Sequence, residues 1–255
     1  MKQFVIIALL ELQRMKRNQI IWFLCLLSAF LLILFDRFHY FTIEEQIKMI
    51  KDFSLGLMNL SMLILVVYYP ICLIKDELSE RTIYSLLSTP ITRNTIILGK
   101  ALAMALVLFI ALFLNSLALS AMLILKGATL SPQLVIALLM IYLKNLTLVS
   151  FAVLFSVLPL SRIIGTIMTL FVYCLGSIKS YFLETLERDL PLYLQYFQKC
   201  VFSLVPNFRI YDVVENITLG RTVTLTHLLF ASVHFIGIAV LIYGISFFIF
   251  NRKEL

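Results

Sequence analysis

The sequence predicts an all-α, polytopic membrane protein, and three observations support this fold class. Of the 255 residues, 62% are hydrophobic and only 14% are charged, whereas an ordinary soluble domain has about 45–50% apolar and about 25% charged residues. The mean hydropathy is +1.01. The apolar residues also gather in stretches close to the roughly 20 residues that cross a hydrocarbon core. The net charge of +7 must therefore crowd into a few polar segments, which excludes a soluble nucleic-acid-binding protein.

The first residues predict a helix that lies in the membrane interface and is not cleaved as a signal peptide. Val5 and Leu9 fall on one face of this helix, and Glu11 and Arg14 on the other. The apolar run 4–10 is short and is followed by Glu11, without a small-residue cleavage site.

Six stretches are long enough, or nearly long enough, to be transmembrane helices. They cover residues 20–35, 53–74, 101–125, 133–158, 163–177 and 227–250. Six crossings place both termini on one side, and the basic cluster Arg14, Lys16 and Arg17 assigns that side to the cytoplasm. We therefore expect one multi-pass domain over residues 1–255, located in the cell (inner) membrane.

The predicted spans lack the groups that intramembrane chemistry needs. None contains Asp or Glu, so a proton relay and an aspartyl protease pair are both missing. His227 and His234 are about 10 Å apart along a helix, too far to share one metal ion. Gly99-Lys100 does not complete a phosphate-binding loop, because position 94 is Asn and position 101 is Ala. We expect no catalytic residues, no metal and no cofactor in this chain, so that any work it does is powered by a separate subunit.

The cysteines predict no disulfide framework. They are too few and too scattered, and three of them sit in apolar runs, as is typical of small buried hydrophobic residues. The four are Cys25, Cys72, Cys174 and Cys200.

Four polar residues inside the spans are candidates for a translocation path: Lys144, Asn145, Asn59 and Asn115. Lys144 lies near the middle of the fourth span, where a charge is costly. Either it faces a polar cavity and attracts an anionic substrate group, or it bonds backbone carbonyls, or the span is displaced by a turn. Asparagines in spans more often join helices than touch a substrate.

Two loops are long enough to carry function, and the stretch 75–100 is the first. From Leu78 it predicts an amphipathic helix on the inner membrane surface, ended at Thr89-Pro90. A second helix is expected to start at Pro90, with Thr89 as its cap, and to run into the third span. Two explanations account equally for Tyr84 on the polar face: its ring binds in a groove of a partner protein, or it is solvated.

The second long loop, 178–226, interleaves aromatic and charged residues, among them Tyr181, Phe182 and Glu184. This pattern predicts extracytoplasmic amphipathic helices at the membrane surface, or segments that pack against the outer ends of the spans.

The stretch from Glu77 to Lys100 resembles the intracellular loop of permease subunits of type-2 ABC exporters. The residues that match the family pattern are Glu80, Thr82, Leu86, Leu87, Ser88, Pro90, Arg93, Gly99 and Lys100, while Arg81 replaces the usual glycine. Pro206-Asn207-Phe208, followed by Tyr211-Asp212, is similar to the copper-enzyme-maturation branch of that family, which includes the nitrous oxide reductase accessory permeases.

The resemblance implies two permease protomers, taken as identical, and two cytoplasmic ABC ATPase subunits that bind ATP and Mg. It implies that helix 77–88 docks into the ATPase. The coupling residues are then Glu77, Glu80, Arg81, Tyr84, Ser88, Pro90 and Arg93. The other expected partners are membrane lipid and an extracytoplasmic protein.

Two further functions compete with an exporter. The chain could be a non-transporting scaffold that anchors an ATPase or an extracytoplasmic partner. It could also be an intramembrane enzyme whose chemistry lies in outer-loop acids, which are Glu184, Glu187, Asp189, Asp212 and Glu215.

Overall fold

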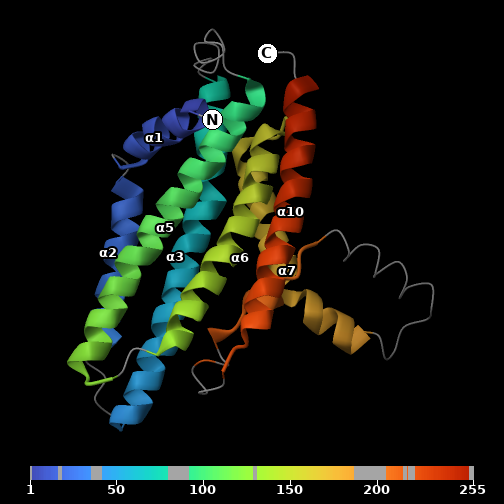
Figure 1. Ribbon diagram of the computed structural model, residues 1–255. Coiled ribbons are helices and arrows are strands. Elements are labelled where there is room, and N and C mark those ends of the chain that lie inside the picture. The colour runs from blue at the N-terminus through green and yellow to red at the C-terminus, as the bar shows by residue number, and fades with distance from the viewer. Residues whose placement is uncertain are drawn as a thin grey trace.

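The computed structural model describes residues 2–16, 19–35, 42–79, 92–128, 131–186, 205–214, 217 and 222–252. In these ranges most residues are helical and none is in a strand, which confirms the all-α prediction. The long helices lie side by side, and both chain termini are at the same end of the bundle (Figure 1).

Seven α-helices and one 3-10 helix make up the described part of the chain. They are α1 (Lys2–Lys16), α2 (Gln19–Phe35), α3 (Ile43–Ser79), α5 (Arg93–Leu125), α6 (Pro132–Val157), α7 (Arg162–Leu186), η1 (Phe208–Tyr211) and α10 (Leu225–Arg252). Five of them, α3, α5, α6, α7 and α10, are long and apolar enough to cross a membrane. The first predicted span corresponds to α2, which has 17 residues and is not among these five.

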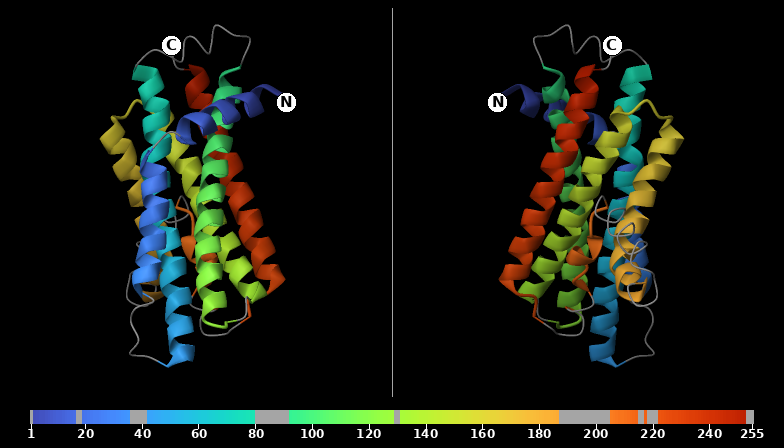
Figure 2. Two further views of the ribbon diagram at one scale, coloured as in Figure 1. Left: turned by 90° about the vertical axis from the view of Figure 1, so that its left-hand side faces the viewer. Right: turned by 90° about the vertical axis from the view of Figure 1, so that its right-hand side faces the viewer.

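Helix α6 lies at the centre of the bundle. It contacts α3, α5, α7 and α10, and residues on all sides of its second half are buried, including Leu148, Phe151 and Ala152. Helix α1 instead crosses the end of the bundle and packs on α5, as both views in Figure 2 show. Ile7 and Ala8 of α1 are buried, while Ile6 and Leu9 are exposed, so this helix keeps one apolar face free for lipid.

The start of α5 corrects the predicted helix that begins at Pro90. The helix begins at Arg93, and its N-cap is Thr92, whose side chain accepts a hydrogen bond from the backbone N–H of Thr95. Thr92 has the extended backbone typical of an N-cap, with φ −76° and ψ 148°. Both Thr89 and Thr92 carry the hydroxyl that a cap needs, and the later one is used.

The structure also corrects where the predicted amphipathic helix from Leu78 begins. Leu78 and Ser79 form the last turn of α3, so no break separates them from the preceding span. Residues 80–91, which hold the rest of the predicted coupling helix, lie outside the described residues.

The outer loop begins later than predicted. Helix α7 continues to Leu186, so Tyr181, Phe182 and Glu184 belong to the same helix as the fifth span and do not start a separate one. Figure 1 shows the last turns of α7 leading away from the other helices. Cys174 on α7 is exposed and Cys72 is half-buried, so the expectation of buried cysteines is wrong for Cys174.

Candidate functional site

A short segment between α7 and α10, residues 206–213, returns to the middle of the bundle. It contains η1, and its Phe208 and Tyr211 side chains are fully buried. In Figure 2 this orange segment lies about halfway along the long helices. The close approach requires Gly176 on α7, because a Cβ there would lie 2.8 Å from Phe208 Cε2, closer still to Phe208 Cδ2, and 2.8 Å from the Pro206 carbonyl oxygen.

The Tyr211 hydroxyl joins this segment to two helices. It lies 3.2 Å from Thr147 Oγ1 on α6 and 3.0 Å from His234 Nδ1 on α10. Thr147 donates its own proton to the Leu143 carbonyl, so its oxygen is left to accept from Tyr211. Burial raises the pKa of the Tyr211 phenol, and the hydrogen bond with Thr147 acts in the opposite direction.

Lys144 has an acidic partner that comes from this segment. Its Nζ lies 2.7 Å from Asp212 Oδ1 and 5.2 Å from the centre of the Tyr173 ring. The Lys144 side chain is 5% exposed, whereas that of Asp212 is 48% exposed. A buried ammonium requires such a counter-charge. Counting acids only within the spans missed this pair, because Asp212 lies in a loop 68 residues further along the chain.

Two of the predicted asparagines lie beside this pair. Asn145 donates to Asn59 Oδ1 at 3.4 Å and to the Ile141 carbonyl at 2.8 Å. Asn59 in turn lies 3.3 Å from the Tyr173 hydroxyl. We call Asn59, Lys144, Asn145, Tyr173 and Asp212 the mid-bundle polar cluster.

Asn115 does not belong to this cluster. Its side-chain oxygen accepts a hydrogen bond from Ser28 of α2, and its amide donates to the Ala111 carbonyl at 2.9 Å. This arrangement joins α2 to α5, the role that polar residues often have between membrane helices.

At the end of the bundle where the termini lie, Arg93 is the predicted coupling residue whose side chain the structure describes. Its Nη1 donates to the carbonyl oxygens of Phe250 and Asn251, at 3.2 and 3.4 Å. These are among the last carbonyls of α10, which carry the negative end of the helix dipole. Glu77 lies on the last turns of α3, whereas Glu80, Arg81, Tyr84, Ser88 and Pro90 lie outside the described residues.

Two further basic residues near this end make contacts that were not predicted from the sequence. Lys75 donates to the carbonyl oxygens of Leu158, at 2.9 Å, and of Leu160, in the connection from α6 to α7. Lys100 forms a buried ion pair with Glu11 of α1 at 3.6 Å and donates to the Leu73 carbonyl at 3.5 Å. Their signal in the sequence is a basic residue at the end of a long apolar run.

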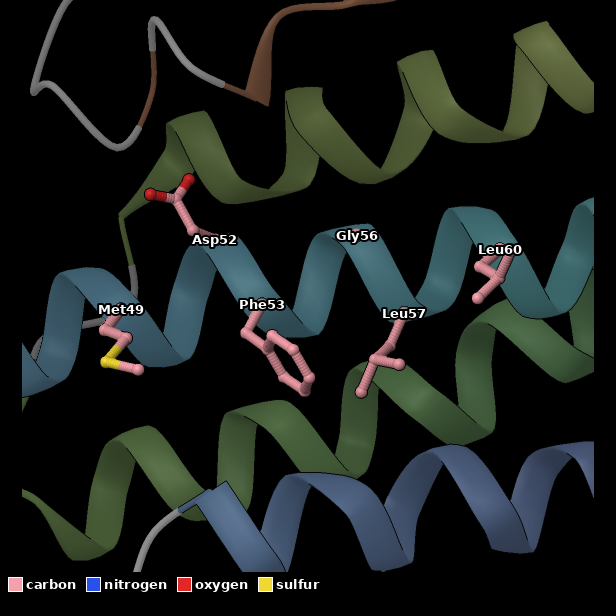
Figure 3. Close-up of a pocket in the computed structure, with 6 residues that line it drawn as sticks. All are labelled: Met49, Asp52, Phe53, Gly56, Leu57 and Leu60. Atoms are coloured by element: carbon pink, nitrogen blue, oxygen red, sulfur yellow. The ribbon is translucent and has the colours of Figure 1, made fainter. Parts of the chain in front are cut away.

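A groove of about 650 Å³ lies along α3. It is lined by Met49, Asp52, Phe53, Gly56, Leu57 and Leu60, and Figure 3 shows the Asp52 side chain pointing to the opposite side of the helix from Met49 and Phe53. One carboxylate among apolar residues forms no catalytic arrangement. Among the described residues, no group of three or more His, Cys, Asp or Glu is placed to hold a metal ion.

Comparison with known proteins identifies the family. A family model described as ABC-2 family transporter protein matches residues 7–178, about two thirds of the chain. A search of the curated proteins found no match. The matched region includes Lys144, Tyr173 and both ends of the 75–100 stretch, and it stops before the 206–213 segment. The chain belongs to the ABC-2 family of membrane transporter proteins.

Proposed function

We propose that this chain is the transmembrane permease subunit of an ATP-driven exporter. In this proposal two copies form the substrate path, and two separate ATPase subunits bind ATP and Mg and drive them. Membership of the ABC-2 family supports the proposal, as does the absence of Asp and Glu from the predicted spans. The similarity of Pro206-Asn207-Phe208 to the copper-enzyme-maturation branch stays a prediction, as does the single-domain organisation.

The proposed subunit crosses the inner membrane six times, with α2 as the additional crossing. A helix of 17 residues is about 26 Å long, slightly less than the roughly 30 Å of a hydrocarbon core. Helix α2 contacts α3 and α5 and runs alongside them in Figure 1. Both termini are then cytoplasmic, because the basic residues 14–17 precede α2, and α1 lies in the cytoplasmic interface.

The observation that carries the coupling proposal is how the two ends of the 75–100 stretch are fixed. Lys75 holds the end of α3 to the connection between α6 and α7, and Arg93 holds the start of α5 to the end of α10. Lys100 adds a contact to α1 through Glu11. A force that an ATPase applies to residues 77–91 would therefore reach the connection between α6 and α7 through Lys75, and α10 through Arg93. The proposed substrate path passes the mid-bundle polar cluster.

The experiment is co-purification with the native ATPase, followed by measurement of ATP hydrolysis and of ATP-dependent transport into inverted vesicles. Glu80→Lys and Tyr84→Ala are expected to weaken complex formation or to uncouple hydrolysis from transport. Asp52→Lys is the matched control, because Asp52 is an exposed acid near the other end of α3. If both loop variants assemble, hydrolyse ATP and transport like the wild type, the coupling role is wrong. A wild-type complex that forms and hydrolyses ATP but transports nothing would favour the scaffold.

A further inference from the structure

The Lys144–Asp212 ion pair is uneven, because its two members are held very differently. Lys144 lies in the middle of α6, the central helix, and its side chain is 5% exposed. Asp212 follows a 3-10 helix of four residues, and nearly half of its side chain is exposed. The Lys144 ammonium is thus enclosed by the bundle, whereas the Asp212 side chain is partly exposed.

The residues around Asp212 fix the 206–213 segment through contacts that do not involve the Asp212 carboxylate. Tyr211 bonds to His234, the Ile210 carbonyl accepts from His227 Nε2 at 2.8 Å, and Phe208 fills the space beside Gly176. The contact described for the Asp212 carboxylate is the one from Oδ1 to Lys144. The Asp212 side chain can therefore turn away from Lys144 while the buried residues of the segment stay in place.

We propose that Lys144 is the binding site for an anionic group of the transported substrate, and that Asp212 occupies this site when substrate is absent. This inference rests on the proposed function, because it assigns the substrate class of the proposed path. Exchanging one anion for another never leaves the Lys144 ammonium unpaired within the bundle. A cationic substrate would have to take Asp212 away from Lys144 and leave that ammonium without a counter-charge, so cations are disfavoured.

The rest of the mid-bundle polar cluster fits a small anionic group. The Tyr173 ring faces the ammonium, and the Asn59 and Asn145 amides bond to each other and to Tyr173, which fixes their orientation. Among these five residues, Asp212 supplies the negative charge. The site therefore has one position for one anion, which suits a carboxylate, a phosphate or a sulfur oxyanion. Such a group is found on a lipid headgroup and on a free small anion alike.

The test measures binding of three probes, without ATP, to the complex of this chain with its ATPase in phosphatidylcholine nanodiscs. Lysophosphatidylglycerol presents the anion on a lipid, thiosulfate presents it free, and lysophosphatidylcholine is the zwitterionic control. Asp212→Asn removes the competing carboxylate and is expected to lower the Kd of at least one anionic probe about tenfold, within the usual range for coupled equilibria. Lys144→Gln is expected to abolish that binding, and Asp52→Asn is expected to bind as the wild type does.

The opposite effects of the two variants separate the proposal from a merely structural ion pair. If the ion pair is merely structural, Asp212→Asn should weaken anion binding or leave it unchanged. Either result would overturn the proposal. Equal binding of lysophosphatidylcholine, or unchanged binding by Lys144→Gln, would overturn it too.

Two further variants keep the test decisive if Lys144→Gln does not fold. The double variant Lys144→Gln/Asp212→Asn leaves no lone charge and must lose anion binding, whereas Lys144→Arg must retain it. The ATP-hydrolysis experiment on Glu80 and Tyr84 does not depend on anion binding, so the two proposals can fail separately.

Discussion

Replacing Gly176 by alanine should push the 206–213 segment away from α7. The new Cβ would lie 2.8 Å from Phe208 Cε2, closer still to Phe208 Cδ2, and 2.8 Å from the Pro206 carbonyl oxygen. The ring can turn, but the carbonyl belongs to the backbone, so the segment itself must shift. Overpacking of this kind costs about 1–3 kcal/mol, and the better helix propensity of alanine offsets about 1 kcal/mol of this cost. We expect a net destabilisation of up to about 2 kcal/mol.

Two assays measure this effect. Thermal unfolding of the purified protein reports the lost stability. The position of the segment is reported by labelling with a water-soluble maleimide. The label reacts with Arg209→Cys, at an exposed position of η1, in a chain without its four native cysteines. Gly56→Ala is the matched control, because a Cβ at Gly56 meets nothing within 4 Å. If Gly176→Ala matches Gly56→Ala in unfolding temperature and in labelling rate, the packing described for Phe208 is wrong.

Three further predictions concern contacts that hold the helices together. Glu11→Gln removes the carboxylate that forms an ion pair with the buried Lys100 and should destabilise by about 3–5 kcal/mol; an unfolding temperature that Glu11→Gln/Lys100→Met does not restore would count against this pair. Tyr211→Phe removes the hydroxyl that contacts Thr147 and His234 and should cost about 1–3 kcal/mol, and an unchanged unfolding temperature would refute the assigned bonds. Arg93→Met should speed hydrogen exchange in the last turn of α10, because Arg93 donates hydrogen bonds to two carbonyls there. Arg93→Lys should restore part of the protection. Equal exchange in the wild type and in both variants would contradict the contact.

Continuous apolar runs with clear ends predicted their helices closely. The predicted span 133–158 corresponds to α6, Pro132–Val157, because Pro132 favours a first turn and Pro159 a stop. The start of α5 was missed by three residues, since Thr89 and Thr92 both carry a capping hydroxyl. Local sequence does not decide between two caps, because the packing of Arg93 against the end of α10 is a contact between distant parts of the chain.

The mid-bundle polar cluster shows a similar limit. A lysine in an apolar run signals that an anion must lie nearby, but the sequence does not say which of the loop acids supplies it. Asn59 and Asn145 meet while Asn115 turns to Ser28, although all three lie in similar apolar surroundings in the sequence. Partners of polar residues inside membrane helices depend on how the helices are rotated in the bundle, which composition alone does not encode.

The central claim, that a separate ATPase moves two copies of this chain, is tested most directly by a distance between the copies. A spin label at Leu125→Cys sits at a side chain that is 86% exposed, at the end of the bundle opposite to the 75–100 stretch. The labelled chain lacks its native cysteines and is reconstituted with the ATPase. Double electron–electron resonance should then give one distance between the protomers, and this distance should change when ATP is bound. The absence of a distance between protomers, or the same distance with and without ATP while the ATPase remains active, would contradict the account.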